Sequence, residues 1–366
     1  MNKNTSCSKK DITISFTEVD WQKRIQDYTA WWRGELDRPL ILCYGQKEDF
    51  VPKRKLHSFL TQYSQKTSAM EIVSDVEQYL DSRIFYGDAY PSFWPNFGPG
   101  VMAAFTEIAD LRSTSDTVWF KPKEDKSLSE IHVTAPLDNC WFKRVKDITE
   151  TAVRRFGSIV QVAHTDLGGN LDTLASFRTT NKLLLDLVDY PEEVERVLWE
   201  SHESWWTYYR EFERIIRKKC RGTTSWACIW APGKTYMLQC DFAYMISPKM
   251  FARFVLPEIQ ASCKRLDYSF YHMDGVGQLP HLDLLLSIPE LHGIQWIPGA
   301  GQPSADTWTD VLQKIRDAGK LVQIYTTSEG ALNVLRKLGG KGFMFWITDS
   351  LTPREAEKFF REAEKT

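Results

Sequence analysis

The stretch Tyr268-Ser-Phe-Tyr-His-Met-Asp-Gly275 is the most informative part of this 366-residue chain for the fold. Its aromatic, apolar start predicts a short strand over residues 268–272, and the run closes on His272, Asp274 and a glycine turn. Side chains two residues apart along a strand point to the same side, so His272 and Asp274 are expected to converge on one ligand. Polar strand ends of this kind are where α/β barrels build their active sites.

Strands and helices alternate around this stretch. Strands are expected at residues 39–44, 158–163, 223–230, 268–272, 292–296, 321–325 and 342–346. Helices are expected at residues 21–33, 71–86, 102–109, 181–188, 191–219, 247–265, 280–287, 306–318, 329–338 and 353–364. Repeated strand–helix units with apolar strands indicate parallel β-structure. The sequence therefore predicts an α/β fold, a closed (β/α)8 TIM barrel, with an open doubly wound sheet as the alternative.

The expected domain organisation is simple. Residues 1–18 are predicted to be an N-terminal tail, and residues 19–366 a single barrel domain with a helical and loop cap over about 19–110. Residues 89–100 hold three prolines, two glycines and several aromatic side chains, which is typical of an ordered loop. We expect this loop to cover the mouth of the barrel, because a lid excludes water from a reaction.

Composition and charge narrow the class of protein. The net charge is −2 with no long basic run, which argues against nucleic acid as the main partner. The polar first ten residues lack the apolar core of a signal peptide, and the apolar runs are too short to span a bilayer, so a cytoplasmic location is expected. Seven cysteines without a CxxC spacing argue against a disulfide framework.

Several stretches, taken in order, resemble a known family. They are Phe97-Gly-Pro-Gly-Val-Met-Ala103, Asp166-Leu-Gly-Gly-Asn-Leu-Asp172, Leu184-Leu-Asp-Leu-Val-Asp-Tyr-Pro-Glu-Glu-Val194, Met245-Ile-Ser-Pro-Lys-Met-Phe251, Phe254-Val-Leu-Pro257 and Tyr271-His-Met-Asp-Gly275. With this order and coverage the chain resembles the uroporphyrinogen decarboxylase-like superfamily, which also contains cobalamin-linked methyltransferases. The resemblance implies a (β/α)8 barrel with its site at the carboxyl ends of the strands.

Two departures from the family pattern limit what the resemblance implies. True uroporphyrinogen decarboxylases carry an arginine-rich N-terminal stretch that meets substrate carboxylates, whereas the corresponding region here offers only Arg33 and Arg38. The zinc-dependent methyltransferases carry His-x-Cys at the strand end and a further cysteine near the C-terminus. This chain has Asp274 in place of the first cysteine and no cysteine after Cys263. The chain is thus closer to the methyltransferase branch, without its thiolate-rich zinc site.

His272 and Asp274 are the leading candidates for a metal site or an acid/base pair. Catalytic zinc takes three protein ligands and keeps one position open. The third ligand is left open among His164, Asp166, Asp241 and Cys240. The alternative is a structural histidine at the rim, with Asp274 capping the glycine turn.

Other residues are candidates for completing the site. His164 and Asp166 repeat the two-residue spacing before Gly168, although a tight turn satisfied by Asp166 explains the pattern equally well. Asp241 is a candidate hydrogen-bonding partner for the substrate. An aromatic-walled cavity for a flat or methylated cationic ligand is expected from Trp94, Phe97, Trp230, Tyr236, Trp296, Tyr325 and Trp346.

The resemblance implies an enzyme that transfers a methyl group from a small methylated compound. Zinc is the expected metal if one is bound, and the corrinoid belongs to a separate partner protein. One alternative is a metal-free decarboxylase or lyase in which Asp274 or Asp166 stabilises a protonated intermediate. A second alternative is a non-catalytic protein that binds a small molecule.

Overall fold

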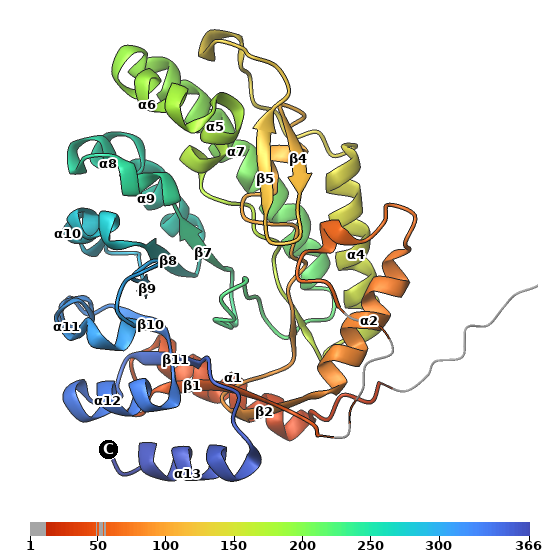
Figure 1. Cartoon of the computed structure of the whole chain (residues 1–366), viewed down its shortest axis with the longest axis vertical. Helices are drawn as coiled ribbons and strands as arrows, with labels where there is room; N and C mark the ends of the chain where they lie inside the picture. Colours follow the sequence, from red (N-terminus) through yellow and green to blue (C-terminus); the bar gives the residue numbers. More distant parts are fainter. Residues whose placement is uncertain (1–11, 49, 51–53, 55) are drawn as a thin grey trace, which may run out of the picture.

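An α/β fold accounts for residues 12–48, 50, 54 and 56–366, which the computed structural model describes (Figure 1). Its main sheet has the strand order β2-β1-β11-β10-β9-β8-β7. Neighbours are parallel except β1 and β2, which are antiparallel. The strands are β1 (Leu40–Gln46), β2 (Arg83–Gly87), β7 (Thr235–Gln239), β8 (Tyr268–Asp274), β9 (Gly293–Ile297), β10 (Leu321–Thr326) and β11 (Phe343–Ile347).

Two shorter ladders stand beside this sheet. β3 (Ser92–Phe93) pairs in parallel with β6 (Gln161–Val162), while β4 (Ala109–Ser113) and β5 (Val118–Pro122) form an antiparallel hairpin. The His164 N–H donates to the Thr224 carbonyl at 2.9 Å, and the Thr235 N–H donates to the Thr223 hydroxyl at 3.2 Å. Residues 223–224 therefore link the end of β6 to the start of β7.

Helices lie on the outer side of the main sheet, most plainly α8 to α12 in Figure 1. The strands are buried along most of their length, which explains their nearly continuous apolar sequences. The helices are α1 (Glu18–Trp32), α2 (Ala69–Asp81), α3 (Met102–Phe105), α4 (Cys140–Phe156), α5 (Asn170–Arg178), α6 (Thr180–Asp189), α7 (Pro191–Ile216), α8 (Pro248–Phe254), α9 (Leu256–Arg265), α10 (Leu282–Leu286), α11 (Thr309–Asp317), α12 (Ser328–Leu338) and α13 (Pro353–Ala363). No helix in the described part of the chain is long and apolar enough to cross a membrane.

The expected strand at 223–230 is wrong. That segment makes only an isolated antiparallel bridge between Thr223 and Ala231, and its backbone turns at Cys228, where φ is 53°. The strand at this place in the sheet is β7, whose residues follow the turn at Pro232 and Gly233. The apolar run 226–231 misled the prediction because it is buried as a loop and not as a strand.

Three expected helices differ from those observed. The helix at 71–86 ends at Asp81, because Arg83–Gly87 pairs with β1 as an edge strand. The helix at 102–109 ends at Phe105, since Ala109 opens the β4–β5 hairpin. The helix at 247–265 breaks at Val255, where Pro257 has no N–H to continue the hydrogen-bond ladder.

The N-terminal segments also differ in detail. Residues 1–11 of the expected tail lie outside the described residues, but Phe16 is buried and packs on Trp21, with ring centroids 5.3 Å apart. The fold thus begins before residue 19. Within the expected lid 89–100, Ser92 and Phe93 form β3 beside β6, so this part belongs to the wall of the fold and not to a cover.

Gly168, which follows β6, packs closely against Gly100. It has φ +78°, and a Cβ there would lie 2.5 Å from the Cα of Gly100. Gly301 has the same φ but nothing within 4 Å of such a Cβ. We expect Gly301→Ala to cost about 1–2 kcal/mol for its left-handed backbone. Gly168→Ala should cost about 1–3 kcal/mol more, because the added methyl group overpacks the contact.

The free energy of unfolding, measured by urea denaturation of the two variants, checks this expectation. Equal losses for Gly168→Ala and Gly301→Ala would contradict the close approach of residues 100 and 168.

Candidate functional site

Three potential metal ligands meet at the ends of β7 and β8. One ligand atom from each of Asp241, His272 and Asp274 lies within 4.8 Å of the other two. The register explains why they meet: Gln239, the last residue of β7, pairs with His272 of β8. Asp274 ends β8 two residues after His272, and Asp241 follows the end of β7 two residues after Gln239. In the described part of the chain this is the one group of His, Cys, Asp and Glu side chains with such a spacing. We call it the Asp–His–Asp cluster.

A chain of side-chain amides fixes the orientation of His272. The Gln323 amide nitrogen donates to the Ala227 carbonyl at 2.9 Å, and a carbonyl can only accept. The Gln323 oxygen must then accept from the Gln295 amide nitrogen, at 2.7 Å. The Gln295 oxygen lies 2.5 Å from His272 Nδ1, so Nδ1 is the nitrogen that carries a proton.

The amide chain leaves His272 Nε2 free for a metal ion or a proton. Nε2 lies 3.8 Å from an Asp274 carboxylate oxygen. A hydrogen bond from the distal ring nitrogen to an acceptor is how proteins set the tautomer of a metal-binding histidine. The edge-on packing of Trp226 against the His272 ring, with centroids 4.9 Å apart, holds the ring in place.

Two more carboxylates surround the cluster. Burial raises the pKa of Asp166 to about 7, with a smaller contribution from the Asp241 charge. Burial also raises the pKa of Asp172, and so does its neighbour Asp241. The Asp172 carboxylate accepts backbone N–H groups from Asp241, at 3.0 Å, and from Phe242, at 2.7 Å, so it anchors the chain that carries Asp241.

The cluster has more negative charge than it can balance by itself. Burial raises the pKa of Asp241, and the Asp274 charge raises it further, although His272 opposes both effects. Burial would lower the pKa of His272, but Asp274 and Asp241 outweigh it and the net shift is upward. No lysine or arginine among the described residues pairs with Asp166, Asp172, Asp241 or Asp274. A cation is therefore the missing counter-charge, either a metal ion or a positively charged ligand.

Of the other residues predicted for the site, two lie outside the cluster and one lies near it. His164 is fully buried away from the cluster, stacked on Tyr209 and 3.1 Å from Glu213. Cys240 is also fully buried, its pKa is raised by burial, and it does not belong to the cluster. Asp166 does lie near the cluster, because the charges of Asp241 and His272 both shift its pKa.

The predicted aromatic residues fall into two groups. Four are buried in the core and contact no cavity described here: Phe97, Trp230, Tyr236 and Trp296. Trp94 and Trp346 line a cavity of ≈ 670 Å³, and Tyr325 packs behind Trp346 with ring centroids 5.4 Å apart. A second hollow of ≈ 540 Å³ shares five wall residues with the first: Gln46, Tyr79, Ser92, Cys228 and Trp346. We call the two together the aromatic cavity.

The aromatic cavity adjoins the Asp–His–Asp cluster through Trp226, which lines the cavity and packs against His272. Sequence reasoning missed Trp226, as well as Gln295, Gln323 and Asp172. The two glutamines left a signal, since each is a lone amide in the middle of an apolar strand. Such a residue is buried and needs partners of its own.

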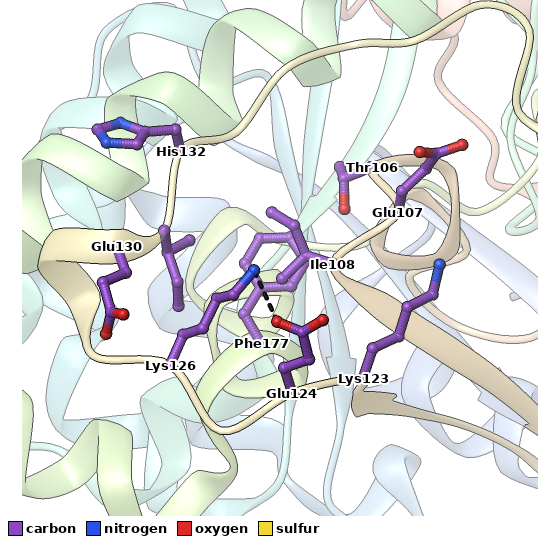
Figure 2. Close-up of a pocket in the computed structure, with 10 residues that line it drawn as sticks. Thr106, Glu107, Ile108, Lys123, Glu124, Lys126, Glu130, His132 and Phe177 are labelled. Carbon is purple, nitrogen blue, oxygen red and sulfur yellow. Dashed lines mark ion pairs between the residues drawn. The ribbon is translucent and has the colours of Figure 1, made fainter.

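A separate pocket near the β4–β5 hairpin has a different character (Figure 2). Its volume is ≈ 160 Å³, and Ile108 and Phe177 lie at its centre. Lys126 pairs with Glu124 across it at 2.9 Å. It shares no residue with the cluster or with the aromatic cavity. This small pocket, which lies apart from the cluster and from the aromatic cavity, is not the candidate site.

The comparisons with known proteins bear on the fold. No protein-family model matches this chain, and no curated protein sequence matches it. Among solved structures, a methyltransferase from Methanosarcina mazei is similar, with a TM-score of 0.61 and 12% sequence identity over 93% of this chain and 98% of that chain. At this identity the likeness shows a shared fold over nearly the whole length of both chains.

The raised pKa of Asp166 has a consequence for stability. A carboxyl group whose pKa is about 7 in the folded protein and near 3.9 in the unfolded one destabilises the fold as pH rises through this window. The penalty is absent below pH 4 and complete above pH 7. Asp166→Asn keeps an oxygen for the Gly168 N–H, which Asp166 now accepts at 2.8 Å, but it removes the charge.

We expect the Asp166→Asn variant, treated with a chelator, to melt at a higher temperature than the wild-type protein at pH 8. The gain should shrink as pH falls and vanish near pH 4. Thermal melts at several pH values measure the difference. A gain that does not change between pH 4 and pH 8 would show that the charge of Asp166 is not its cause.

Proposed function

We propose that this protein is a metal-dependent methyltransferase of the uroporphyrinogen decarboxylase-like superfamily that acts on a small methylated compound. One observation carries the proposal: three ligand atoms from Asp241, His272 and Asp274 lie together at strand ends, with His272 Nε2 left free by the amide chain. The similar fold of the Methanosarcina mazei methyltransferase supports the reaction class.

We infer that the strands close into a (β/α)8 barrel. The main sheet runs from β1 to β7, and the His164–Thr224 and Thr235–Thr223 hydrogen bonds carry the ring on to β6 and β3. The Asp88 N–H donates to the Ile41 carbonyl at 2.7 Å and connects the segment before β3 back to β1. This closure supports a mouth at the carboxyl ends of the strands, where the cluster lies.

The donor set fits a divalent metal such as zinc. Zinc accepts imidazole nitrogen and carboxylate oxygen, and three protein ligands leave a position for a substrate. In this proposal Asp241 is the third ligand, chosen over His164, Asp166 and Cys240 because it lies with His272 and Asp274. By the resemblance, Asp274 stands where the zinc-dependent methyltransferases of the superfamily have a cysteine. A metal held here would polarise a substrate heteroatom as a Lewis acid.

The surrounding residues have separate roles in methyl transfer. A methyl group transferred as CH3+ leaves both bonding electrons on the heteroatom, which then takes up a proton. Asp166, with a pKa of about 7 and a position near His272, is suited to supply that proton. The acceptor of the methyl group is the corrinoid of a separate partner protein.

Metal binding tests the cluster directly. We expect wild-type protein to bind one Zn²⁺ per chain, and His272→Gln, Asp241→Asn and Asp274→Asn each to weaken binding at least about tenfold, because each loses one of three ligands. Asp274→Cys should keep or tighten binding, since thiolate is a good zinc ligand. Titration calorimetry and metal analysis of the purified protein measure this.

Cys240→Ala is the matched control and should leave metal affinity unchanged, because Cys240 lies outside the cluster. The metal proposal fails if the three cluster variants bind Zn²⁺ as well as the wild-type protein does. Methyl transfer from small methylated compounds to a free corrinoid in its cob(I) state, assayed with the same variants, then tests the reaction class.

The amide chain offers a test of positioning. Gln323→Leu removes the group that fixes the Gln295 amide, so Gln295 is free to turn its NH2 toward His272 Nδ1. The proton of neutral His272 would then move to Nε2, and we expect metal affinity to fall about 10–100-fold. Nitrogen NMR of His272 in metal-free protein reports the same change without any metal. An unchanged Nδ1–H tautomer in Gln323→Leu would refute the role of the chain.

Metal-free decarboxylation is a second candidate function, favoured by one observation. The buried Asp166 carboxyl group, with its pKa of about 7, resembles a group kept ready to stabilise or supply a proton. In this reading activity persists after chelation of metals and is lost in Asp166→Asn.

A further inference from the structure

We propose that the aromatic cavity binds an aromatic carboxylate and that Arg83 holds its carboxylate group. The methylated group of the substrate would then face the Asp–His–Asp cluster, a step that rests on the proposed methyltransferase function. Carboxylate binding by Arg83 does not depend on that function and is tested separately.

Arg83 is a cation with a free hydrogen-bonding edge. It is half-buried at the wall of the aromatic cavity, and its Nε is buried without a hydrogen-bond partner. Its guanidinium lies over two aromatic rings, 5.5 Å from the centroid of Tyr79 and 5.9 Å from that of Tyr44. Within the described residues, no carboxylate forms an ion pair with it. The rings thus hold Arg83 in place, and within the described residues no hydrogen bond occupies its terminal nitrogens.

This arrangement matches a carboxylate ligand. A buried donor without an acceptor raises the free energy of the folded protein, because it has lost its hydrogen bonds to water. An acceptor brought by a ligand restores a hydrogen bond without a further desolvation cost for that donor. Nε and one terminal nitrogen of arginine present two parallel N–H groups, which a carboxylate accepts in a bidentate manner. The other arginine of the cavity, Arg54, is already paired with Asp75 at 3.0 Å. Arg83 is therefore the better anchor for an anion.

The walls of the cavity specify a flat, apolar body between the anion and the cluster. Seven Phe, Tyr and Trp side chains line it: Tyr44, Tyr79, Phe85, Phe93, Trp94, Trp226 and Trp346. Aromatic rings pack well against such walls, which is a common feature of ligand cavities. The indole N–H groups of Trp94 and Trp226 are buried without partners, so the ligand is expected to carry acceptor atoms along its length.

The position of Trp226 gives the ligand a direction. Arg83 lines the hollow bounded by β1 and β2, whereas Trp226 lines the adjoining hollow and touches His272. A carboxylate at Arg83 would direct the opposite substituent of the ring toward Trp226 and the cluster. An aromatic acid with a methoxy substituent supplies the carboxylate for Arg83 and the flat ring for the aromatic walls. Its ether oxygen is also an acceptor for an indole N–H.

Binding of three ring compounds and one small anion tests the proposal without metal or methyl transfer. We expect 3-methoxybenzoate and 4-methoxybenzoate to bind the purified wild-type protein at least tenfold more tightly than methoxybenzene, which lacks the charge, or acetate, which lacks the ring. Arg83→Gln should remove this preference for the carboxylate and weaken methoxybenzoate binding at least tenfold. Titration calorimetry and quenching of tryptophan fluorescence measure both.

Matched variants separate binding from folding. Arg112→Gln alters an exposed arginine of β4 that pairs with Asp110, and it should bind methoxybenzoate as the wild-type protein does. Arg83→Lys keeps the charge but not the two-pronged donor, so it should bind with intermediate affinity; it also replaces Arg83→Gln if that variant does not fold. Equal binding of methoxybenzoate and methoxybenzene, or methoxybenzoate binding unchanged in both Arg83 variants, would overturn the proposal. Tight binding without methyl transfer would leave it standing and count against the proposed function.

Discussion

The Ala227 carbonyl determines the chemistry of His272 through two glutamines that lie between them. A carbonyl oxygen accepts and cannot donate. This fixes the donor and the acceptor of each hydrogen bond in the chain from Gln323 to Gln295 to His272. The chain reaches across β10, β9 and β8 at one level of the sheet, because Gln323 pairs with Gln295 and Gln295 with His272 in the strand register. The free Nε2 that any metal or proton chemistry needs is therefore set by the backbone of a distant loop.

The carboxylates around His272 need a cation to balance their charge. Burying an ionised carboxyl group disfavours its charged form, and a second charge nearby adds to the cost. Asp166, Asp172 and Asp241 all carry raised pKa values for this reason. A protein that needed only stability would gain by replacing them with neutral side chains. Their presence near a histidine with a fixed tautomer argues for a site in which function outweighs stability.

Part of this site was visible in the sequence. His272 and Asp274 follow an apolar run with the two-residue spacing of one strand face, and β8 carries them as expected. His164 and Asp166 show the same spacing, yet His164 turns to Glu213 on α7. The local sequence does not distinguish the two patterns, because the residue that contacts each histidine lies tens of residues away in the chain. Asp241, the third member of the cluster, was one option among four in the sequence, since the strand that precedes it was sought at 223–230 and lies at 235–239.

The loop that replaced the expected strand connects the two halves of the candidate site. Its Ala227 carbonyl anchors the amide chain, Trp226 packs on the His272 ring, and Cys228 lines the aromatic cavity. Cys228 has a backbone φ of 53°, a conformation that costs a residue with a side chain about 1–3 kcal/mol. The Tyr90 hydroxyl holds it there by donating to the Cys228 carbonyl at 2.9 Å. A ligand that contacts Trp226 or Cys228 from the cavity acts on the loop whose Trp226 and Ala227 hold His272, so the shape of the cavity and the orientation of the histidine depend on each other.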